Sequence, residues 1–205
     1  MQNGALATSL EDLWREAVRA SVARGAIVDP PIDRLQRVST PGTAWANVIA
    51  WPAEHMHARI ARMFDTHHLA IALRDRDWLL QLHDAWGAAP WDSRSQPLRA
   101  QGEIALALTP GGPRAAGWSP DELAELHEDG HLSPHIPSEH AWALLAAGDV
   151  GGAREALRDY DDTLTVDVRE MATTDETELR RLTAWPDRVL RIESRALHAL
   201  LDPAG

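Results

Sequence analysis

The most constraining feature of the sequence is a short stretch of alternating residues, TLTVDVRE, at positions 163–170. Leu164, Val166 and Val168 alternate with polar residues, and two of these three are β-branched, as in a half-buried strand. Most of the remaining chain has helical periodicity instead. A single strand leaves a row of backbone donors and acceptors unpaired. The sequence therefore predicts a second strand beside this one, in the same chain, in a partner or in a bound peptide.

The best second strand within the chain is the stretch WPDRVLRIES at 185–194. Leu190 and Ile192 alternate with charged residues, as a strand requires. Val189, Ile192 and Ala196 also have the spacing of a helix that begins at the proline of this stretch. We favour the strand, because the first strand needs a partner.

Helical periodicity accounts for most of the chain before residue 160. The first predicted helix begins at Ser9, with Asp12 three residues later in the capping position. Its predicted apolar face consists of Leu10, Leu13, Trp14, Ala17, Val18 and Val22. Residues 25–43 lose the periodicity and contain several prolines, so they are predicted to form a connection.

Further helix starts are marked by prolines or capping side chains. They are predicted at Pro52, Asp77, Ser93 or Ser95, Ser119, Pro137, Asp149 and, with Glu176 in a capping box, Thr173. The predicted fold is mainly α. It has an N-terminal helical bundle over residues 1–160 and a small C-terminal α/β region, strand–helix–strand, over residues 161–205.

Composition limits the classes of function. The 205 residues carry a formal net charge of −11 and contain no cysteine. The acidic balance argues against nucleic acid or an anionic membrane as a partner, and the lack of cysteine excludes disulfides and thiolate-bound metals. No apolar run is long enough to span a bilayer and no basic-then-apolar leader opens the chain, so we expect a cytoplasmic protein.

Residues 127–131, HEDGH, match the H-E-x-x-H motif, in which two imidazoles bind zinc and the glutamate acts as a base. Both zinc ligands must lie on an unbroken helix, whereas Gly130 has the position of a helix stop. We therefore interpret this stretch as an ordinary helix end. A zinc hydrolase that uses His127, Glu128 and His131 is the alternative.

A second set of possible ligands follows the order of a di-iron bundle. Glu54 and His57 form an E-x-x-H pair, a second pair lies at 128–131, and Glu16 and Glu103 lie on predicted helices. Such pairs are expected by chance in a chain of this composition, so the di-iron enzyme is also kept as an alternative. Other histidines are interpreted as surface or hydrogen-bonded core residues, namely His55, His67, His68 and His83.

Residues 73–128 combine three patterns that occur together in one known family. They are the acidic-then-aromatic stretch LRDRDWLLQLHDAW at 73–86, the residues PL, GEI and L spaced over 97–108, and DELAEL at 121–126. The combination resembles the partner proteins of multinuclear non-haem iron oxidases, of which the methanobactin biosynthesis C-type proteins are an example.

The resemblance implies a helical domain that forms a heterodimer with a barrel-shaped iron enzyme. It also implies a small C-terminal sheet that holds the leader of a ribosomally made precursor peptide, in the biosynthesis of a copper-chelating natural product. The iron and the oxidation of peptide cysteines would belong to the partner enzyme, so no cofactor is expected in this chain.

An exposed strand edge can accept a peptide as an added strand, with main-chain hydrogen bonds for affinity and alternate side chains for selection. The predicted peptide-binding residues are Thr163, Leu164, Thr165, Val166, Asp167, Val168 and Arg169. We therefore predict a non-catalytic partner subunit, with no catalytic residue and no metal ligand of its own. The alternatives are the stand-alone di-iron or zinc enzyme and a plain helical protein-interaction adaptor.

Overall fold

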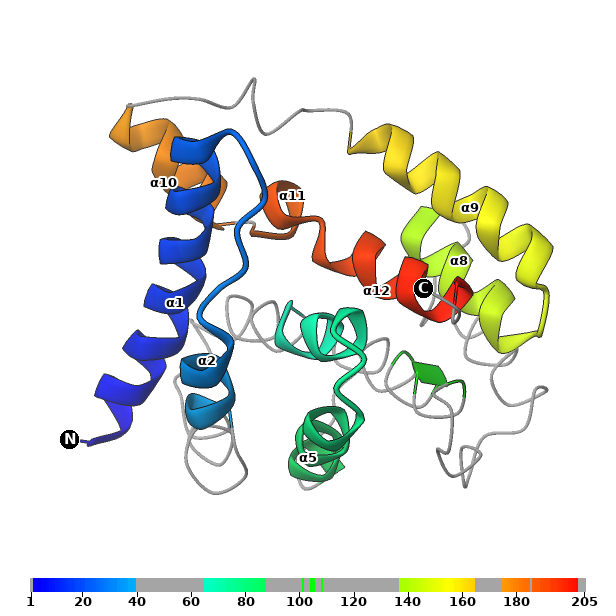
Figure 1. Ribbon diagram of the computed structural model, residues 1–205, viewed down its shortest axis with the longest axis horizontal. Coiled ribbons are helices and arrows are strands. Elements are labelled where there is room, and N and C mark those ends of the chain that lie inside the picture. The colour runs from blue at the N-terminus through cyan, green and yellow to red at the C-terminus, as the bar shows by residue number, and fades with distance from the viewer. Residues whose placement is uncertain are drawn as a thin grey trace.

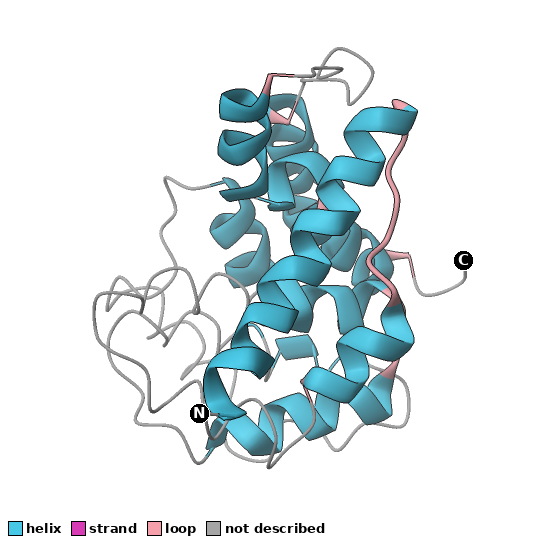
Figure 2. Cartoon of the chain, turned by 90° about the vertical axis from the view of Figure 1, so that its left-hand side faces the viewer, coloured by secondary structure: helices cyan, strands magenta, loops and turns pink. Residues whose placement is uncertain are grey.

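The structure is a computed structural model that describes residues 2–39, 65–87, 101, 104–105, 108, 137–164, 175–184 and 186–202. The described residues form helices and contain no strand (Figure 1 and Figure 2). The helices are α1 (Gln2–Arg24), α2 (Ile32–Val38), α5 (Arg76–Gly87), α8 (Pro137–Ala146), α9 (Val150–Thr163), α10 (Glu176–Ala184), α11 (Pro186–Leu190) and α12 (Ile192–Leu201). Residues 65–72 are also helical. The mainly α prediction is confirmed for this part of the chain.

The helix α1 supplies one long side of the core. All six residues of its predicted apolar face are buried, namely Leu10, Leu13, Trp14, Ala17, Val18 and Val22. The helix begins at Gln2, so Ser9 lies several residues after its start and the predicted start was wrong. It ends at Arg24 and is followed by Gly25, whose positive φ of 60° lets the amide of Ala26 donate to the carbonyl of Ser21, as in a Schellman motif.

The connection predicted for residues 25–43 contains the short helix α2. Pro31 precedes it with an extended backbone, Asp33 lies in its first turn, and Leu35 is fully buried. The helix packs against α1. Pro31, one of the prolines that argued for a connection, therefore marks the start of a helix.

The hairpin α8–α9 is joined by a tight turn at Gly148, which has φ of 76°. Asp149 caps α9 by accepting a hydrogen bond from the backbone amide of Gly152 at 2.9 Å. The predicted helix starts at Pro137 and Asp149 are both confirmed. The helix α5, predicted from Asp77 and ended by Gly87, begins one residue earlier, at Arg76.

The C-terminal residues are helical where the second strand was predicted, so that strand was wrong. A helix does begin at Pro186, as in the alternative, but it ends at Leu190, and a second helix begins at Ile192. The apolar residues of this stretch are buried at helical spacing, namely Val189, Leu190, Ile192, Ala196 and Leu197. As Figure 1 shows, α11 lies against α1 and α12 lies against α8 and α9. The predicted boundary at residue 160 falls inside α9.

Arg191 makes the bend between α11 and α12 with a left-handed backbone, φ 51° and ψ 43°. For a residue with a Cβ atom, this conformation costs roughly 1–2 kcal/mol. Its guanidinium reaches across to α9, where Nη2 donates to the carbonyl oxygen of Leu164 at 2.9 Å. The bend therefore joins the end of α9 to the start of α12.

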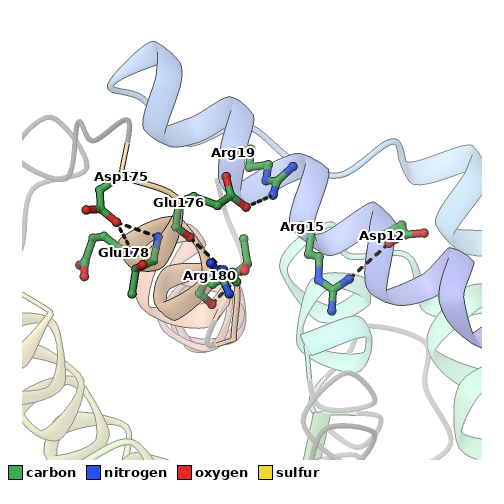
Figure 3. A network of polar contacts seen from close by, with 9 residues as sticks. Asp12, Arg15, Arg19, Asp175, Glu176, Glu178 and Arg180 are labelled. Atoms are coloured by element: carbon green, nitrogen blue, oxygen red, sulfur yellow. Dashed lines mark hydrogen bonds and ion pairs between the residues drawn. The ribbon is translucent and has the colours of Figure 1, made fainter.

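The helix α10 begins at a carboxylate cap and lies beside α1 (Figure 3). Oδ1 of Asp175 accepts hydrogen bonds from the amides of Thr177 and Glu178 at 2.7 and 3.1 Å. These backbone donors, with that of Glu178 the stronger influence, hold the pKa of Asp175 below its usual value of 3.8. Glu176 in turn binds Arg19 of α1 at 2.9 Å.

The lowered pKa of Asp175 predicts a pH-dependent helix start. The cap contributes fully above the unfolded-state pKa of about 3.9 and is lost as the pH falls through the lower folded-state pKa. Asp175→Ser keeps a capping oxygen without the charge, so we expect it to lose this pH dependence. Asp175→Ala removes the cap and should weaken α10 where the wild-type carboxylate is ionised, and this difference should shrink as the pH falls through the folded-state pKa. Amide hydrogen exchange of α10 between pH 2 and pH 6 measures both effects. Identical pH profiles for the wild type and Asp175→Ser would contradict the prediction.

Candidate functional site

The predicted peptide-binding strand begins within a helix. Thr163 is the last residue of α9, and its Oγ1 donates to the carbonyl of Tyr160 at 2.6 Å. Leu164 caps this helix, and its amide donates to the carbonyls of Tyr160 and Asp161. The strand was therefore wrong at these two positions, because the helical bonds of α9 continue through them. Residues 165–169 lie outside the described part of the chain, and their role in peptide binding stays a prediction.

The di-iron alternative needs carboxylates that face the interior of a bundle. Glu16 instead lies on the exposed side of α1 and pairs with Arg34 at 3.4 Å, with a side chain 60% exposed. It is therefore placed away from a buried metal. The remaining proposed ligands lie outside the described residues, namely Glu54, His57, Glu103, His127, Glu128 and His131. Among the residues that the structure describes, no group of three or more histidines and carboxylates could hold a metal ion.

His67 and His68 are both buried within the helical residues 65–72. Nε2 of His68 forms a hydrogen bond with the side-chain amide of Gln101, with 2.7 Å between Nε2 and Oε1. The ring of His68 stacks on Trp142 of α8, with centroids 5.8 Å apart and planes 16° from parallel. The interpretation of His68 as a hydrogen-bonded core histidine is confirmed.

A polar seam joins α12 to the α8–α9 hairpin, and we define it as Trp142, Tyr160, Asp161, Glu193, Ser194 and His198. At its centre the carboxylate of Glu193 accepts a hydrogen bond from Nε1 of Trp142 at 3.1 Å and another from the hydroxyl of Tyr160 at 3.3 Å. The indole of Trp142 is fully buried, so its N–H depends on this acceptor. Glu193 therefore links α12 to both helices of the hairpin.

Asp161 makes the complementary link from α9 to α12. Its Oδ1 accepts from the hydroxyl of Ser194 at 2.5 Å, and its Oδ2 accepts from Nε2 of His198 at 2.8 Å. The two donors lie four residues apart, which places them one turn apart on one face of α12. A carboxylate that receives two hydrogen bonds in this way fixes the rotation of α12 about its axis.

The seam contains serine, histidine and aspartate but does not have the order of a catalytic triad. In a triad the histidine lies between the other two and removes the proton of the hydroxyl. Here the aspartate lies between, and both donors point to it. Ser194 is also 4% exposed, which keeps its hydroxyl from a substrate. The arrangement positions helices and does not activate a nucleophile.

Sequence reasoning did not select the seam as a site. The stretch that contains Glu193 and Ser194 was interpreted as a strand, which would place these adjacent residues on opposite faces. The alternative helix would have placed Ser194 and His198 on one face, and this spacing was the available signal. Nothing in the sequence DYDD at 159–162 indicates which carboxylate they bind.

No protein-family model, curated protein or solved structure matches this chain significantly. The family resemblance of residues 73–128 therefore stays a prediction. Within the described residues, none of the helices combines the length and the apolar composition that a bilayer span requires.

The buried indole of Trp142 predicts an asymmetric response to changes at Glu193. Glu193→Ala leaves the N–H without its acceptor, and we expect the free energy of unfolding to fall by about 1–3 kcal/mol. Glu193→Gln keeps an acceptor oxygen and should lower the free energy of unfolding clearly less. Urea unfolding followed by tryptophan fluorescence measures both, with Tyr160→Phe as the control that removes the longer bond to Glu193 and keeps the bond from Trp142. Equal losses for Ala and Gln would show that the acceptor is not what matters.

Proposed function

We propose that this chain is a non-catalytic binding subunit that docks on a protein partner through its helices and binds a peptide with residues 165–169. In its specific form, the partner is an iron-dependent peptide-modifying oxidase and the peptide is the leader of a ribosomally made precursor. This specific form rests on the resemblance of residues 73–128. The iron, and the chemistry it supplies, belongs to the partner.

The observation that supports a non-catalytic role is that the described carboxylates bind side chains of neighbouring helices. Glu193 and Asp161 each receive two hydrogen bonds that tie one helix to another. Glu16, the one described member of the di-iron set, forms an exposed ion pair with Arg34. These carboxylates serve the assembly of helices, which is what a rigid docking scaffold needs.

The peptide-binding part of the proposal rests on residues 165–169 and on where this segment starts. Leu164 precedes it directly, and its carbonyl is held by Arg191 at 2.9 Å. Its amide is held by the last turn of α9. The segment therefore leaves from a fixed point, and fixing one end lowers the entropy lost when a peptide is bound.

The partner proposal is tested by elemental analysis of the chain purified alone and after co-expression with its genomic neighbours. We expect the lone chain to be free of metal and a co-purifying neighbour to contain iron. One or two metal ions per lone chain, lost on His131→Ala, would overturn the proposal in favour of a metalloenzyme.

The peptide proposal predicts a backbone-specific effect at residue 166. Val166→Pro removes an N–H that an added strand would use, and we expect peptide affinity to fall about three- to tenfold, the effect of one lost hydrogen bond. Val166→Ala keeps the N–H and is the matched control. Fluorescence anisotropy with a labelled precursor leader gives both dissociation constants. Equal affinities for the two variants would argue against binding as an added strand.

A further inference from the structure

The bend at Arg191 is unusual for its sequence. Residues 186–201, PDRVLRIESRALHALL, contain no glycine, and their single proline is the first residue of α11. Arginine is a good helix former, and the left-handed conformation it adopts here is one that glycine favours. The local preference of this stretch is therefore one continuous helix, and packing on the two sides of Arg191 imposes the bend.

The packing partners on the two sides are separate. Val189 and Leu190 of α11 are buried, and this helix packs against α1. Ile192, Ala196 and Leu197 of α12 are buried, and this helix packs against α8 and α9. The backbone of Arg191 connects the two helices.

The described polar partners of α12 that fix its position precede the bend in the sequence. Trp142, Tyr160 and Asp161 lie on the α8–α9 hairpin, and Asp29 binds the guanidinium of Arg195 at 2.6 and 3.2 Å. At the far end, Arg154 donates to the carbonyl of Leu201 and to the side chain of Asp202. A second copy of the chain offers the same partners in the same arrangement.

We propose that α12 is exchanged between two copies of this chain, with Arg191 as the hinge. In the exchanged dimer Arg191 becomes helical, α11 stays on its own α1, and α12 docks on the α8–α9 hairpin of the second copy. The surface of the α8–α9 hairpin is then covered by α12 of the second copy, because the hairpin residues of the seam already bind this helix. The exchange keeps the seam and relieves the strained backbone in both chains. It gives up the bond from Arg191 to Leu164 and the entropy of association.

Two substitutions at the hinge test the proposal. Arg191→Ala and Arg191→Gly both remove the bond to Leu164, so they differ only in backbone preference. Alanine favours the straight helix, whereas glycine accepts the bend without strain. We expect the dimer dissociation constant of Arg191→Ala to be at least about tenfold below that of Arg191→Gly, measured by size exclusion with light scattering over a concentration series. Equal constants, or monomers for both variants at all concentrations, would overturn the proposal.

The absence of native cysteine allows the exchange itself to be detected. Asp161→Cys with Ser194→Cys, placed in the Arg191→Ala background, replaces a short contact between α9 and α12 by a possible disulfide. After oxidation of the dimer, we expect the disulfide to join two chains on a non-reducing gel. A disulfide confined to one chain would show an ordinary dimer and would contradict the exchange.

A second measurement needs no cysteine and covers the case in which that variant does not fold. The ¹³Cα and ¹³C′ chemical shifts of residues 189–193 report the backbone of the hinge. In the dimer of Arg191→Ala they should take the values of a continuous helix, and in the monomer of Arg191→Gly those of a left-handed residue at 191. Chemical shifts typical of a left-handed residue at position 191 in the dimer would overturn the proposal that Arg191 is the hinge.

Discussion

The described structure depends on two carboxylates that cross-link α12 and the α8–α9 hairpin. Glu193 of α12 accepts from Trp142 and Tyr160 on the hairpin, and Asp161 of the hairpin accepts from Ser194 and His198 on α12. Because each bond is directional, the pair fixes both the position and the rotation of α12. Burial of Ile192, Leu197 and Leu201 then adds about 1.5–3 kcal/mol for each side chain. Hydrophobic burial provides stability, and the seam selects one arrangement.

This arrangement strains the backbone at Arg191, which has a left-handed conformation. The sequence around it favours a continuous helix, yet the chain bends there because α11 packs on α1 while α12 packs on the hairpin. Its guanidinium offsets part of the strain by binding the end of α9. Leu164, which lies directly before residues 165–169, and the start of the last helix are thus held by one side chain. This shared contact is where the proposed binding segment meets the helical core.

Residues whose local signals agree with their packing were predictable from the sequence. The buried face of α1 and the starts of α8 and α9 follow from apolar spacing, Pro137 and Asp149. The helices α11 and α12 were missed because Leu190 and Ile192 fit the spacing of a strand as well as that of a helix over a short stretch. The strand was chosen because the expected first strand needed a partner. The seam was missed for the same reason, since its donors share a face only on a helix. No local pattern could have indicated that Glu193 and Trp142, 51 residues apart, form a hydrogen bond.

The contacts of the seam make α12 part of the same cooperative core as the α8–α9 hairpin. Native-state hydrogen exchange in low concentrations of denaturant tests this cooperativity. We expect amides in the middle of α12 to exchange with the same free energy and denaturant dependence as those in the middle of α8. Exchange of α12 through a separate opening of low free energy, while α8 stays protected, would contradict it.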